Sequence, residues 1–269
     1  MKIALICSAV LLIAVKANAQ MIVDPTKPLT NKPEETEIFP PQGALPKVIQ
    51  PGKTFDVAPS DAIVLFDGKN LDEWVSTRGK TPAKWTLADG AMVVNKQAGD
   101  IQTKRDFTNY QLHIEFRIPQ NITGSGQSRG NSGIFLAATN GKAGGYEIQV
   151  LDGYNNENKT YVNGMVGSIY KQFIPLANAA KPPGEWETYD VIWTAPVFNA
   201  DGTLKSPARA TVFFNGVLVE NNVELLGPTQ YIGKPTYAGK AHGPEPIKLQ
   251  AHGDKSEPLS FRNIWVREL

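Results

Sequence analysis

Two acids and an amide lie close together in the segment YEIQVLD, residues 146–152. In an extended strand, Glu147 and Gln149 project from one face, because side chains alternate between the two faces. Asp152 would then fall on the apolar face, where an ionised carboxylate is costly. A β-bulge at residues 150–151 would return Asp152 to the face of the other two side chains. The segment therefore predicts acid, amide and acid in a row. Glu147 is a catalytic candidate for general acid–base chemistry, with a solvated strand acid as the alternative. Asp152 is predicted in the catalytic group as an orienting residue, with a turn-capping role as the alternative.

His252, in LQAHGD (residues 249–254), is the second candidate for acid–base chemistry. A histidine side chain can take up and release a proton near neutral pH, and this is one of three in the chain. We predict that His252 is catalytic, and that Glu147 acts either as the base or as the group that orients His252. Gln250 shares its strand face and is predicted, with Gln149, to contact the substrate. A hydrogen-bonded structural histidine at a strand end is the alternative.

The segment RGNSGIF, residues 129–135, supplies another polar stretch. Asn131 and Ser132 carry hydrogen-bonding side chains, and the glycines on either side permit close approach of a ligand to the backbone. A phosphate-binding loop is a poor interpretation, since its lysine and its following helix are both missing. We predict that Asn131 and Ser132 contact the substrate, with a structural β-turn as the alternative.

Four further residues are candidates for the walls of a site. Tyr170 offers an aromatic face and Lys171 a cation, with a solvated surface charge as the alternative for the lysine. Trp186 is the tryptophan best suited to stacking on a ligand, whereas the other four are expected in the core or at its rim. His242 is a candidate for the rim of the site.

The sequence requires no cofactor. Glu147, His252 and an amide oxygen would suit a divalent cation. Neither Glu147 nor His252 belongs to a His-x-Glu or His-x-x-x-His spacing, so the sequence does not support the site and the metal requirement stays open.

The first 19 residues have the pattern of a secretory signal peptide. Lys2 precedes an apolar run at residues 3–15, and residues 17–19 read Ala-Asn-Ala, a small-x-small cleavage pattern. The run is too short for a transmembrane helix. The single cysteine, Cys7, lies within it, so the mature chain is expected to fold without a disulfide. We therefore expect export to the periplasm or the extracellular space.

The net charge indicates which kinds of partner the chain can bind, and the proline content indicates where its domain begins. Lys and Arg number 27 against 26 Asp and Glu, which excludes a basic surface for nucleic acid and points to a neutral substrate. Residues 20–59 are proline-rich without apolar periodicity, so we expect an arm or linker there. Residues 60–269 are predicted to form a single domain.

Short alternating segments dominate this domain. YQLHIEFRI, residues 110–118, places its apolar side chains on one face, and Asn215-Gly216 between two apolar runs predicts a β-hairpin. No segment has a sustained helical period, and no repeat of propeller-blade length is present. The sequence predicts an all-β fold, an antiparallel β-sandwich of jelly-roll type.

The spacing E-x-Q-x-x-D resembles the E-x-D-x-x-E signature of the laminarinase and lichenase type of glucanase. That resemblance implies a concave β-sandwich in which the outer carboxylates are nucleophile and general acid. Here Gln149 replaces the middle acid, and Asp152 is shorter than the glutamate of the signature. Both departures weaken an ordinary two-carboxylate glycosidase mechanism.

A broader resemblance extends from Ile63 to Leu269. The chain resembles the 3-keto-disaccharide hydrolase domain family, formerly a domain of unknown function with a concanavalin A-like lectin/glucanase fold. Six segments carry the resemblance, in this order: LFDGKNLDEW, GNSGIFL, YEIQVLDGYNN, GSIYKQFIPLANAAKPPGEWETYDVIWTAP, NGVLVENNVELLGPT and LQAHGD with FRNIWVREL. The resemblance implies an exported enzyme that acts on an oligosaccharide or glycoside already oxidised at C3, supplied by an oxidoreductase.

A ketone at C3 acidifies the hydrogen on C2, so a base can remove it and the C1 substituent can leave by elimination. Water either adds afterwards or does not, so hydrolase and lyase outcomes both stay open. Such a site needs a base, donors for the enolate oxygen and an acid for the leaving oxygen. A non-catalytic carbohydrate-binding module and a conventional glycoside hydrolase are the alternative functions.

Overall fold

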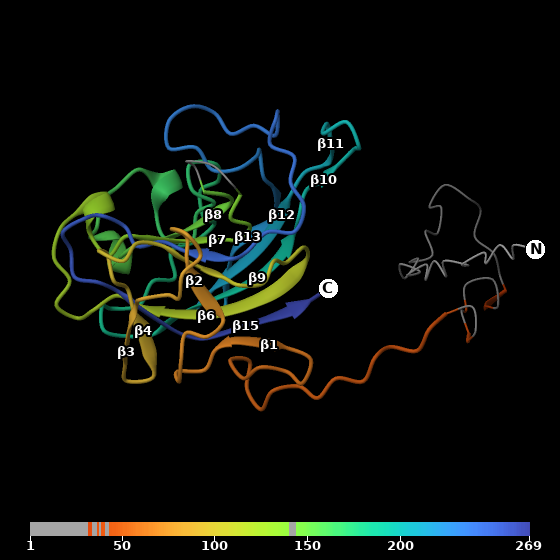
Figure 1. Cartoon of the computed structure of the whole chain (residues 1–269), viewed down its shortest axis with the longest axis horizontal. Coiled ribbons are helices and arrows are strands. Elements are labelled where there is room, and N and C mark those ends of the chain that lie inside the picture. The colour runs from red at the N-terminus through yellow and green to blue at the C-terminus, as the bar shows by residue number, and fades with distance from the viewer. Residues whose placement is uncertain (1–31, 34–36, 38, 41–42, 140–143) are drawn as a thin grey trace, which may run out of the picture. The chain divides into compact units, whose positions relative to one another are not determined.

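A computed structural model describes residues 32–33, 37, 39–40, 43–139 and 144–269 (Figure 1). The chain divides into two units, residues 1–49 and 50–269, and the second unit contains all the described strands. The predicted signal peptide lies outside the described residues. No helix in the described part of the chain is long and apolar enough to cross a membrane.

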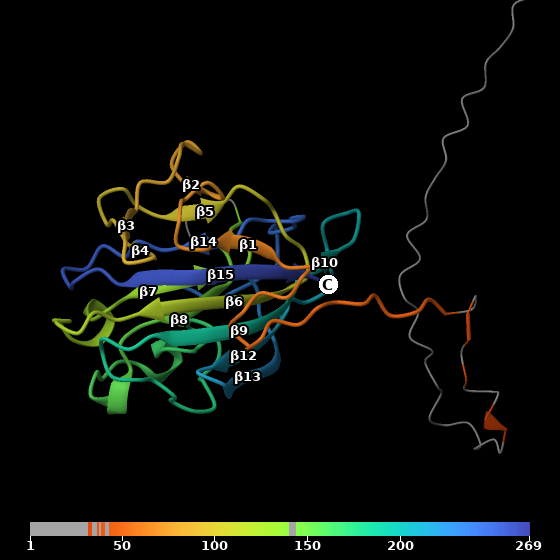
Figure 2. The same ribbon diagram turned by 90° about the horizontal axis from the view of Figure 1, so that it is seen from below.

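The larger sheet has the strand order β13-β12-β9-β6-β15-β4-β3, with β1 also paired to β15 (Figure 2). All of its described strand pairs are antiparallel. Its strands are β1 (Ile63–Phe66), β3 (Thr86–Ala88), β4 (Ala91–Val93), β6 (Tyr110–Arg117), β9 (Glu187–Thr194), β12 (Arg209–Phe214), β13 (Val217–Glu224) and β15 (Ser260–Glu268).

The smaller sheet has the order β2-β5-β14-β7-β8 and is also antiparallel. Its strands are β2 (Trp74–Ser76), β5 (Ile101–Thr103), β7 (Ser132–Phe135), β8 (Glu147–Val150) and β14 (Lys248–Leu249). A separate ribbon pairs β10 (Val197–Phe198) with β11 (Leu204–Ser206). Single-turn 3₁₀ helices follow β6 and β8 in the chain: η2 (Gly126–Ser128), η3 (Tyr154–Asn156) and η4 (Val162–Gly164).

The alternating pattern predicted for residues 110–118 is confirmed in β6. Leu112, Ile114 and Phe116 are fully buried in the core. The predicted hairpin is also confirmed, because β12 and β13 are joined by Asn215-Gly216. Both turn residues have positive φ, 51° and 79°, which is the conformation that a two-residue turn between twisted strands requires.

The two sheets face each other across one hydrophobic core. The hydroxyl group of Tyr189 in the larger sheet donates to the Gln149 carbonyl in the smaller sheet at 2.8 Å. The rings of Trp193 and Tyr146 lie 5.1 Å apart between their centres. The predicted antiparallel β-sandwich is therefore confirmed, and the outer face of the smaller sheet is left for a site.

The bulge predicted at residues 150–151 is absent. β7 and β8 pair in unbroken register from Ser132 opposite Val150 to Phe135 opposite Glu147. The strand simply ends at Val150, and the Asp152 amide donates to the Arg129 carbonyl beyond it. The backbone therefore leaves the sheet before Asp152 can join the face of Glu147.

Residues 50–59, predicted as part of the proline-rich arm, belong to the compact unit that carries the sandwich. The Asp56 carbonyl accepts hydrogen bonds from Asn263 and from the Trp265 indole. This part of the segment is tied to β15, the long strand of the larger sheet.

Candidate active site

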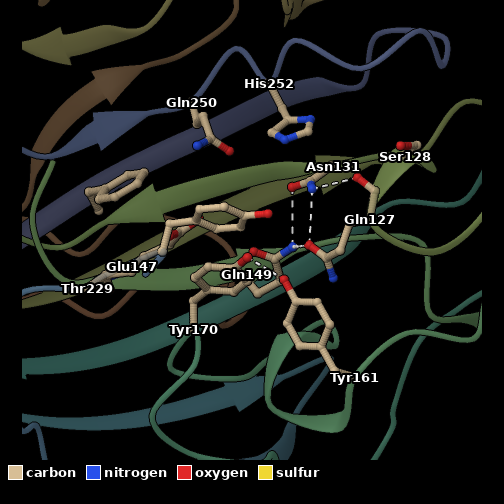
Figure 3. Close-up of a pocket in the computed structure, with 12 residues that line it drawn as sticks. Gln127, Ser128, Asn131, Glu147, Gln149, Tyr161, Tyr170, Thr229, Gln250 and His252 are labelled. Atoms are coloured by element: carbon tan, nitrogen blue, oxygen red, sulfur yellow. Dashed lines mark hydrogen bonds between the residues drawn. The ribbon is translucent and has the colours of Figure 1, made fainter. Parts of the chain in front are cut away.

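A cavity of about 420 Å³ opens on the outer face of the smaller sheet, beneath the loops that follow β6 and β8 (Figure 3). Strands β7 and β8 and the segment after β14 form its floor. Its described lining consists of Gln127, Ser128, Asn131, Phe135, Glu147, Gln149, Tyr161, Tyr170, Thr229, Tyr231, Gln250 and His252. The structure thus brings together Glu147, Gln149, Asn131, Tyr170, Gln250 and His252 of the predicted site residues.

Glu147 is a buried acid with an unusual proton affinity. Its side chain points away from the core because Ile148, its neighbour in β8, fills the opposite face. Burial raises the pKa of Glu147 to about 8; the positive charge of Lys248 opposes this shift and the negative charge of Asp100 adds to it. No described residue donates a hydrogen bond to its carboxyl group. Glu147 is therefore a protonated acid at neutral pH, with a proton to donate.

Gly133 provides the space that the Glu147 carboxyl group occupies. A Cβ atom at Gly133 would lie 2.4 Å from Oε1 of Glu147, which is closer than van der Waals contact allows. The two residues are near neighbours on adjacent strands, since Gly133 is opposite Gln149. The carboxyl group of Glu147 on the adjacent strand therefore leaves no room for a side chain at Gly133. The backbone does not require a glycine there, because the φ of Gly133 is not positive.

We expect Gly133→Ala to displace the Glu147 carboxyl group and lower kcat by about ten- to a hundredfold. The melting temperature should change little, because the methyl group meets one side-chain end. Gly243→Ala is the matched control, since a Cβ atom there meets nothing within 4 Å. Equal activity of the two variants in a steady-state assay would contradict this role of Gly133.

His252 forms a dyad with Asp254. Nδ1 of His252 lies 2.7 Å from Oδ2 of Asp254, and a carboxylate oxygen can only accept, so Nδ1 carries the proton. The imidazole then presents Nε2 as its basic nitrogen. Burial would raise the pKa of Asp254, but hydrogen bonds from Ser256, His252 and Lys96 outweigh it and hold that pKa at about 2. A permanently charged Asp254 fixes the tautomer and the direction of the ring.

Lys96 and Ser256 hold Asp254 in place. Nζ of Lys96 donates to Oδ1 of Asp254 at 2.9 Å, to the Asp254 carbonyl at 3.1 Å and to the Ser256 carbonyl at 2.7 Å. The Ser256 amide donates to the same Oδ1 at 2.7 Å. The Asp254 side chain is nearly inaccessible to solvent. Because these contacts fix Asp254, they also fix the position of the His252 ring that is hydrogen-bonded to it.

We therefore expect Lys96→Met to lower kcat by about tenfold. Lys96 is not part of the described cavity lining, so the effect would be transmitted through Asp254 and His252. The loss arises because Asp254 keeps its burial but loses a charged partner. Lys69→Met is the control, since Lys69 forms an exposed ion pair with Asp67. A kcat equal to that of the control would show that Lys96 does not position the dyad.

The side chains of three amide residues in the cavity form a closed hydrogen-bond network (Figure 3). Gln127 donates to the Gly164 carbonyl at 2.8 Å, which fixes its Oε1 as an acceptor. Gln149 uses both amide protons on Oε1 of Gln127 and Oδ1 of Asn131, each at 3.2 Å. Asn131 donates to the Gln127 carbonyl at 2.7 Å. Both amide protons of Gln149 are used in this way, so Gln149 presents its oxygen to the cavity as an acceptor for a hydroxyl group.

Tyr161 and Tyr170 share a short hydrogen bond between their hydroxyl groups. Two hydroxyl groups carry two protons and the shared bond uses one, so one proton remains for a ligand. Burial, together with the contact to Tyr161 and the charge of Glu147, raises the pKa of Tyr170 well above its usual range. The pair is a neutral donor throughout the physiological pH range.

Two predicted site residues lie outside the cavity lining because of the strand geometry. Asp152 forms an ion pair with Arg129 at 2.5 Å and accepts from the Tyr154 amide, so its carboxylate is fully engaged. Ser132 follows Asn131 in the pleat and therefore points to the opposite side, where it donates to the Gln250 carbonyl. Asp152 and Ser132 therefore form contacts within the protein, and the structure does not place them where the predicted catalytic and substrate-binding roles require.

Three other predicted residues also have their own partners. The Trp186 ring contacts the guanidinium groups of Arg117 and Arg262, which lie 4.6 and 4.1 Å from its centre. His242 contacts the Tyr146 hydroxyl group through Nε2 at 2.9 Å. Lys171 donates to the Tyr231 carbonyl at 2.6 Å, beside the cavity. None of the three belongs to the described cavity lining.

Sequence reasoning did not assign roles to Asp254, Gln127 or Tyr161. Asp254 stands two residues after His252, and a His-x-Asp spacing is a usable signal for a local dyad. Gln127 and Tyr161 come from irregular loops, where neither period nor motif indicates the direction of a side chain. Among the described residues no group of three or more His, Cys, Asp or Glu side chains could hold a metal ion.

Comparison with known proteins assigns the chain to a family. Residues 61–267 match the 3-keto-alpha-glucoside-1,2-lyase-like domain. The crystal structure of a "putative glycosyl hydrolase" from Parabacteroides distasonis ATCC 8503 is 52% identical, with a TM-score of 0.80, over 91% of this chain and 100% of that one. A second so-named structure from this strain, 23% identical with a TM-score of 0.55, covers 77% of this chain and 99% of its own, and shows the same fold.

A curated relative, the 3-keto-disaccharide hydrolase of Bacteroides thetaiotaomicron, is 28% identical over 151 residues. The match covers 46% of this chain and 49% of the relative, so the chain spans about half the length of that protein. These likenesses support a glycosyl-hydrolase-like function for a carbohydrate substrate. The family match extends over residues 61–267, which include most of the β-sandwich, and the chain therefore belongs to the 3-keto-alpha-glucoside-1,2-lyase-like domain family.

Proposed function

We propose that the chain cleaves 3-keto-glycosides by removing the proton on C2 and eliminating the C1 substituent. One observation carries the proposal: a histidine base held by a charged aspartate and a buried, protonated glutamic acid line the same cavity. Two titratable groups in contrasting environments are the usual arrangement for divided acid and base roles.

In the first step Nε2 of His252 takes the C2 proton. The electron pair of the C–H bond moves to the C3 carbonyl and forms an enolate, so no positive charge develops at C1. Asp254 stabilises the imidazolium that results, because its carboxylate lies 2.7 Å from Nδ1. The remaining proton of the Tyr161–Tyr170 pair is suited to the enolate oxygen.

In the second step the enolate re-forms the C3 carbonyl and the bond from C1 to the leaving oxygen breaks. Glu147 donates its proton to that oxygen, which its raised pKa of about 8 equips it to do at neutral pH. The products are the free aglycone and a sugar with a C1=C2 double bond. Release at this stage is a lyase reaction. Addition of a water hydroxyl group to C1, with return of the proton from His252 to C2 and transfer of the other water proton to Glu147, is a hydrolase reaction that restores both residues.

A conventional retaining glycosidase needs a second carboxylate roughly 5–5.5 Å from the first. Among the described lining residues Glu147 is the single carboxylic acid, and Asp152 is paired with Arg129. A carbohydrate-binding module would not need an acid whose burial costs stability. Both alternatives therefore explain the cavity less well than elimination does.

The proposal is tested with purified protein and two substrates, a 3-keto-glucoside and its unoxidised parent. Release of aglycone from the oxidised substrate alone is the expected result. Cleavage of both substrates would point to an ordinary glycosidase. Binding of both without turnover would point to a binding module, and each of these two outcomes would overturn the proposal.

We also propose that the protein is exported and that another enzyme supplies its oxidised substrate. The leader pattern in residues 1–19 supports a periplasmic or extracellular location. A 3-keto-glycoside must come from an oxidoreductase that converts the C3 hydroxyl group of a sugar to a ketone. Fractionation of cells that express the full chain with a C-terminal tag tests the location, and recovery in the cytoplasm would contradict it.

A further inference from the structure

The mouth of the cavity differs chemically from its floor. The floor carries amides, the acid and the histidine, whereas the mouth carries two exposed tyrosines, Tyr161 and Tyr231. Tyr231 is 71% exposed and is followed by Ile232, which is 84% exposed. Tyr161 is 40% exposed and is followed by Val162, which is 54% exposed. Two separate loops thus each bring a tyrosine to one opening, and in each loop an exposed aliphatic residue follows the tyrosine in the chain.

Lys171 fastens the two loops to each other. Its Nζ lies 4.2 Å from the centre of the Tyr231 ring and 5.5 Å from that of Tyr161. The same atom donates to the Tyr231 carbonyl at 2.6 Å, and the Lys171 amide donates to the Asn163 carbonyl at 2.7 Å. Lys171 has a φ of 59°, a conformation that a residue with a side chain adopts at an energetic cost. The rim is therefore held in place before a ligand arrives, which lowers the entropy cost of binding.

The rim is also continuous with the catalytic strand. Thr229, two residues before Tyr231, accepts a hydrogen bond from the Glu147 amide through Oγ1 at 3.1 Å. Its own amide donates to the Gly145 carbonyl at 2.8 Å. In the described part of the chain no aromatic ring stacks on Tyr231. A group that leaves from C1 near Glu147 would pass along this apolar rim.

We propose that Tyr161 and Tyr231 form a leaving-group subsite that selects a flat, apolar aglycone, such as a phenol, over a second sugar. The inference rests on the proposed function, because it assigns the sugar to the polar floor. A second sugar would gain from several hydrogen-bonding groups at the rim, and Val162 and Ile232 offer none. The Lys171 ammonium group is already directed at the Tyr231 carbonyl and ring, and Ser128 carries the exposed aliphatic hydroxyl group of the described lining. An aromatic ring instead gains from stacking on tyrosine and from burial of its apolar surface.

The test compares wild type with Tyr231→Ala on a phenyl 3-keto-glucoside and on a 3-keto-disaccharide. We expect kcat/KM for the phenyl substrate to fall by about three- to tenfold, and that for the disaccharide to fall by less than about twofold. Comparing the variant with wild type on each substrate cancels the intrinsic advantage of phenol as a leaving group. Tyr231→Phe keeps the ring and should therefore retain the preference for the phenyl substrate that Tyr231→Ala loses. Phe213→Ala, which removes an exposed ring from β12 of the larger sheet, is the control for unchanged activity.

Equal losses on both substrates, or no loss on either, would overturn the subsite. Binding of unoxidised phenyl glucoside and unoxidised disaccharide, measured by calorimetry, keeps the inference separate from the chemistry. If the wild type prefers phenyl glucoside and Tyr231→Ala abolishes that preference, the subsite stands even where no 3-keto-glycoside is cleaved. Without any such preference in binding or in cleavage, the subsite is wrong while the proposed reaction can still hold.

Discussion

Replacing His252 with alanine is expected to lower kcat on a 3-keto-glycoside by about 10²–10⁴-fold, the usual contribution of a positioned general base. The residual site keeps its amides and its acid, so KM should change much less. His252 is half-buried and hydrogen-bonded mainly to Asp254, so the melting temperature should stay within a few degrees of the wild type. Single-turnover kinetics on the purified variant measure the effect on the chemical step.

Asp254→Asn and His242→Ala complete this experiment. The amide that replaces the Asp254 carboxylate could donate to Nδ1 and favour the wrong tautomer of His252. Asp254→Asn should therefore lose a large part of the activity even though it keeps the shape of the side chain. His242 contacts Tyr146 outside the cavity lining, so His242→Ala should keep its activity. A His252→Ala variant as active as His242→Ala would exclude His252 as the base.

Replacing Glu147 with glutamine is expected to remove the alkaline limb of the pH–rate profile. The wild type should lose activity as pH rises through about 8, because Glu147 then loses the proton that it donates. Glutamine cannot supply this proton, so kcat should fall by about 10²–10⁴-fold and no longer respond to this titration. A phenol leaves more readily without a proton, so the loss should be smaller for a phenyl substrate. An unchanged alkaline limb in the variant would exclude Glu147 as the acid.

The same substitution should stabilise the fold in a pH-dependent way. The ordinary pKa of the glutamic acid is 4.5, whereas the folded value is about 8. Between these pH values the unfolded chain releases the proton and the folded chain keeps it, so the wild type loses stability as pH rises. The loss reaches at most about 5 kcal/mol above pH 8 and is absent below pH 4.5. Glutamine does not titrate, so the difference in melting temperature should grow from pH 4.5 to pH 8 and then level off.

Denaturation of both proteins across this pH range is the measurement. Asp201→Asn, which changes an exposed carboxyl group at a turn, is a control for the general effect of removing a negative charge. A constant difference between Glu147→Gln and the wild type at all pH values would contradict a raised pKa for Glu147. The expected gain in stability would mean that the site keeps a buried acid for chemistry at the expense of the fold.

Strand periodicity was enough to predict the face that carries the chemistry. Glu147 and Gln149 project into the cavity, and Gln250 and His252 join them from the other side of β7, because apolar and polar residues alternate along both segments. The same rule, applied to RGNSGIF, separates Asn131 from Ser132 and would have excluded the serine. The antiparallel sandwich followed from this alternation together with the hairpin turn.

Residues beyond the strand ends could not be predicted in this way. Asp152 lies past the end of β8, where the chain direction depends on a contact with Arg129 that sequence spacing does not indicate. Trp186 contacts two arginines that come from strands far apart in the chain. The raised pKa of Glu147 likewise depends on burial by loops, and a sequence pattern cannot quantify burial.

The most direct test of C2 proton abstraction uses a 3-keto-glucoside with deuterium at C2, incubated with wild-type protein in ordinary water. The deuterium content at C2 of the released sugar is measured at low conversion, with His252→Ala as the control for uncatalysed exchange. Elimination predicts slower cleavage than for the unlabelled substrate. Release of the unsaturated sugar predicts loss of the label in step with aglycone release, whereas hydration with return of the same deuteron from His252 keeps the label but cleavage is still slowed. Cleavage at the unlabelled rate with the deuterium retained at C2 would contradict the account.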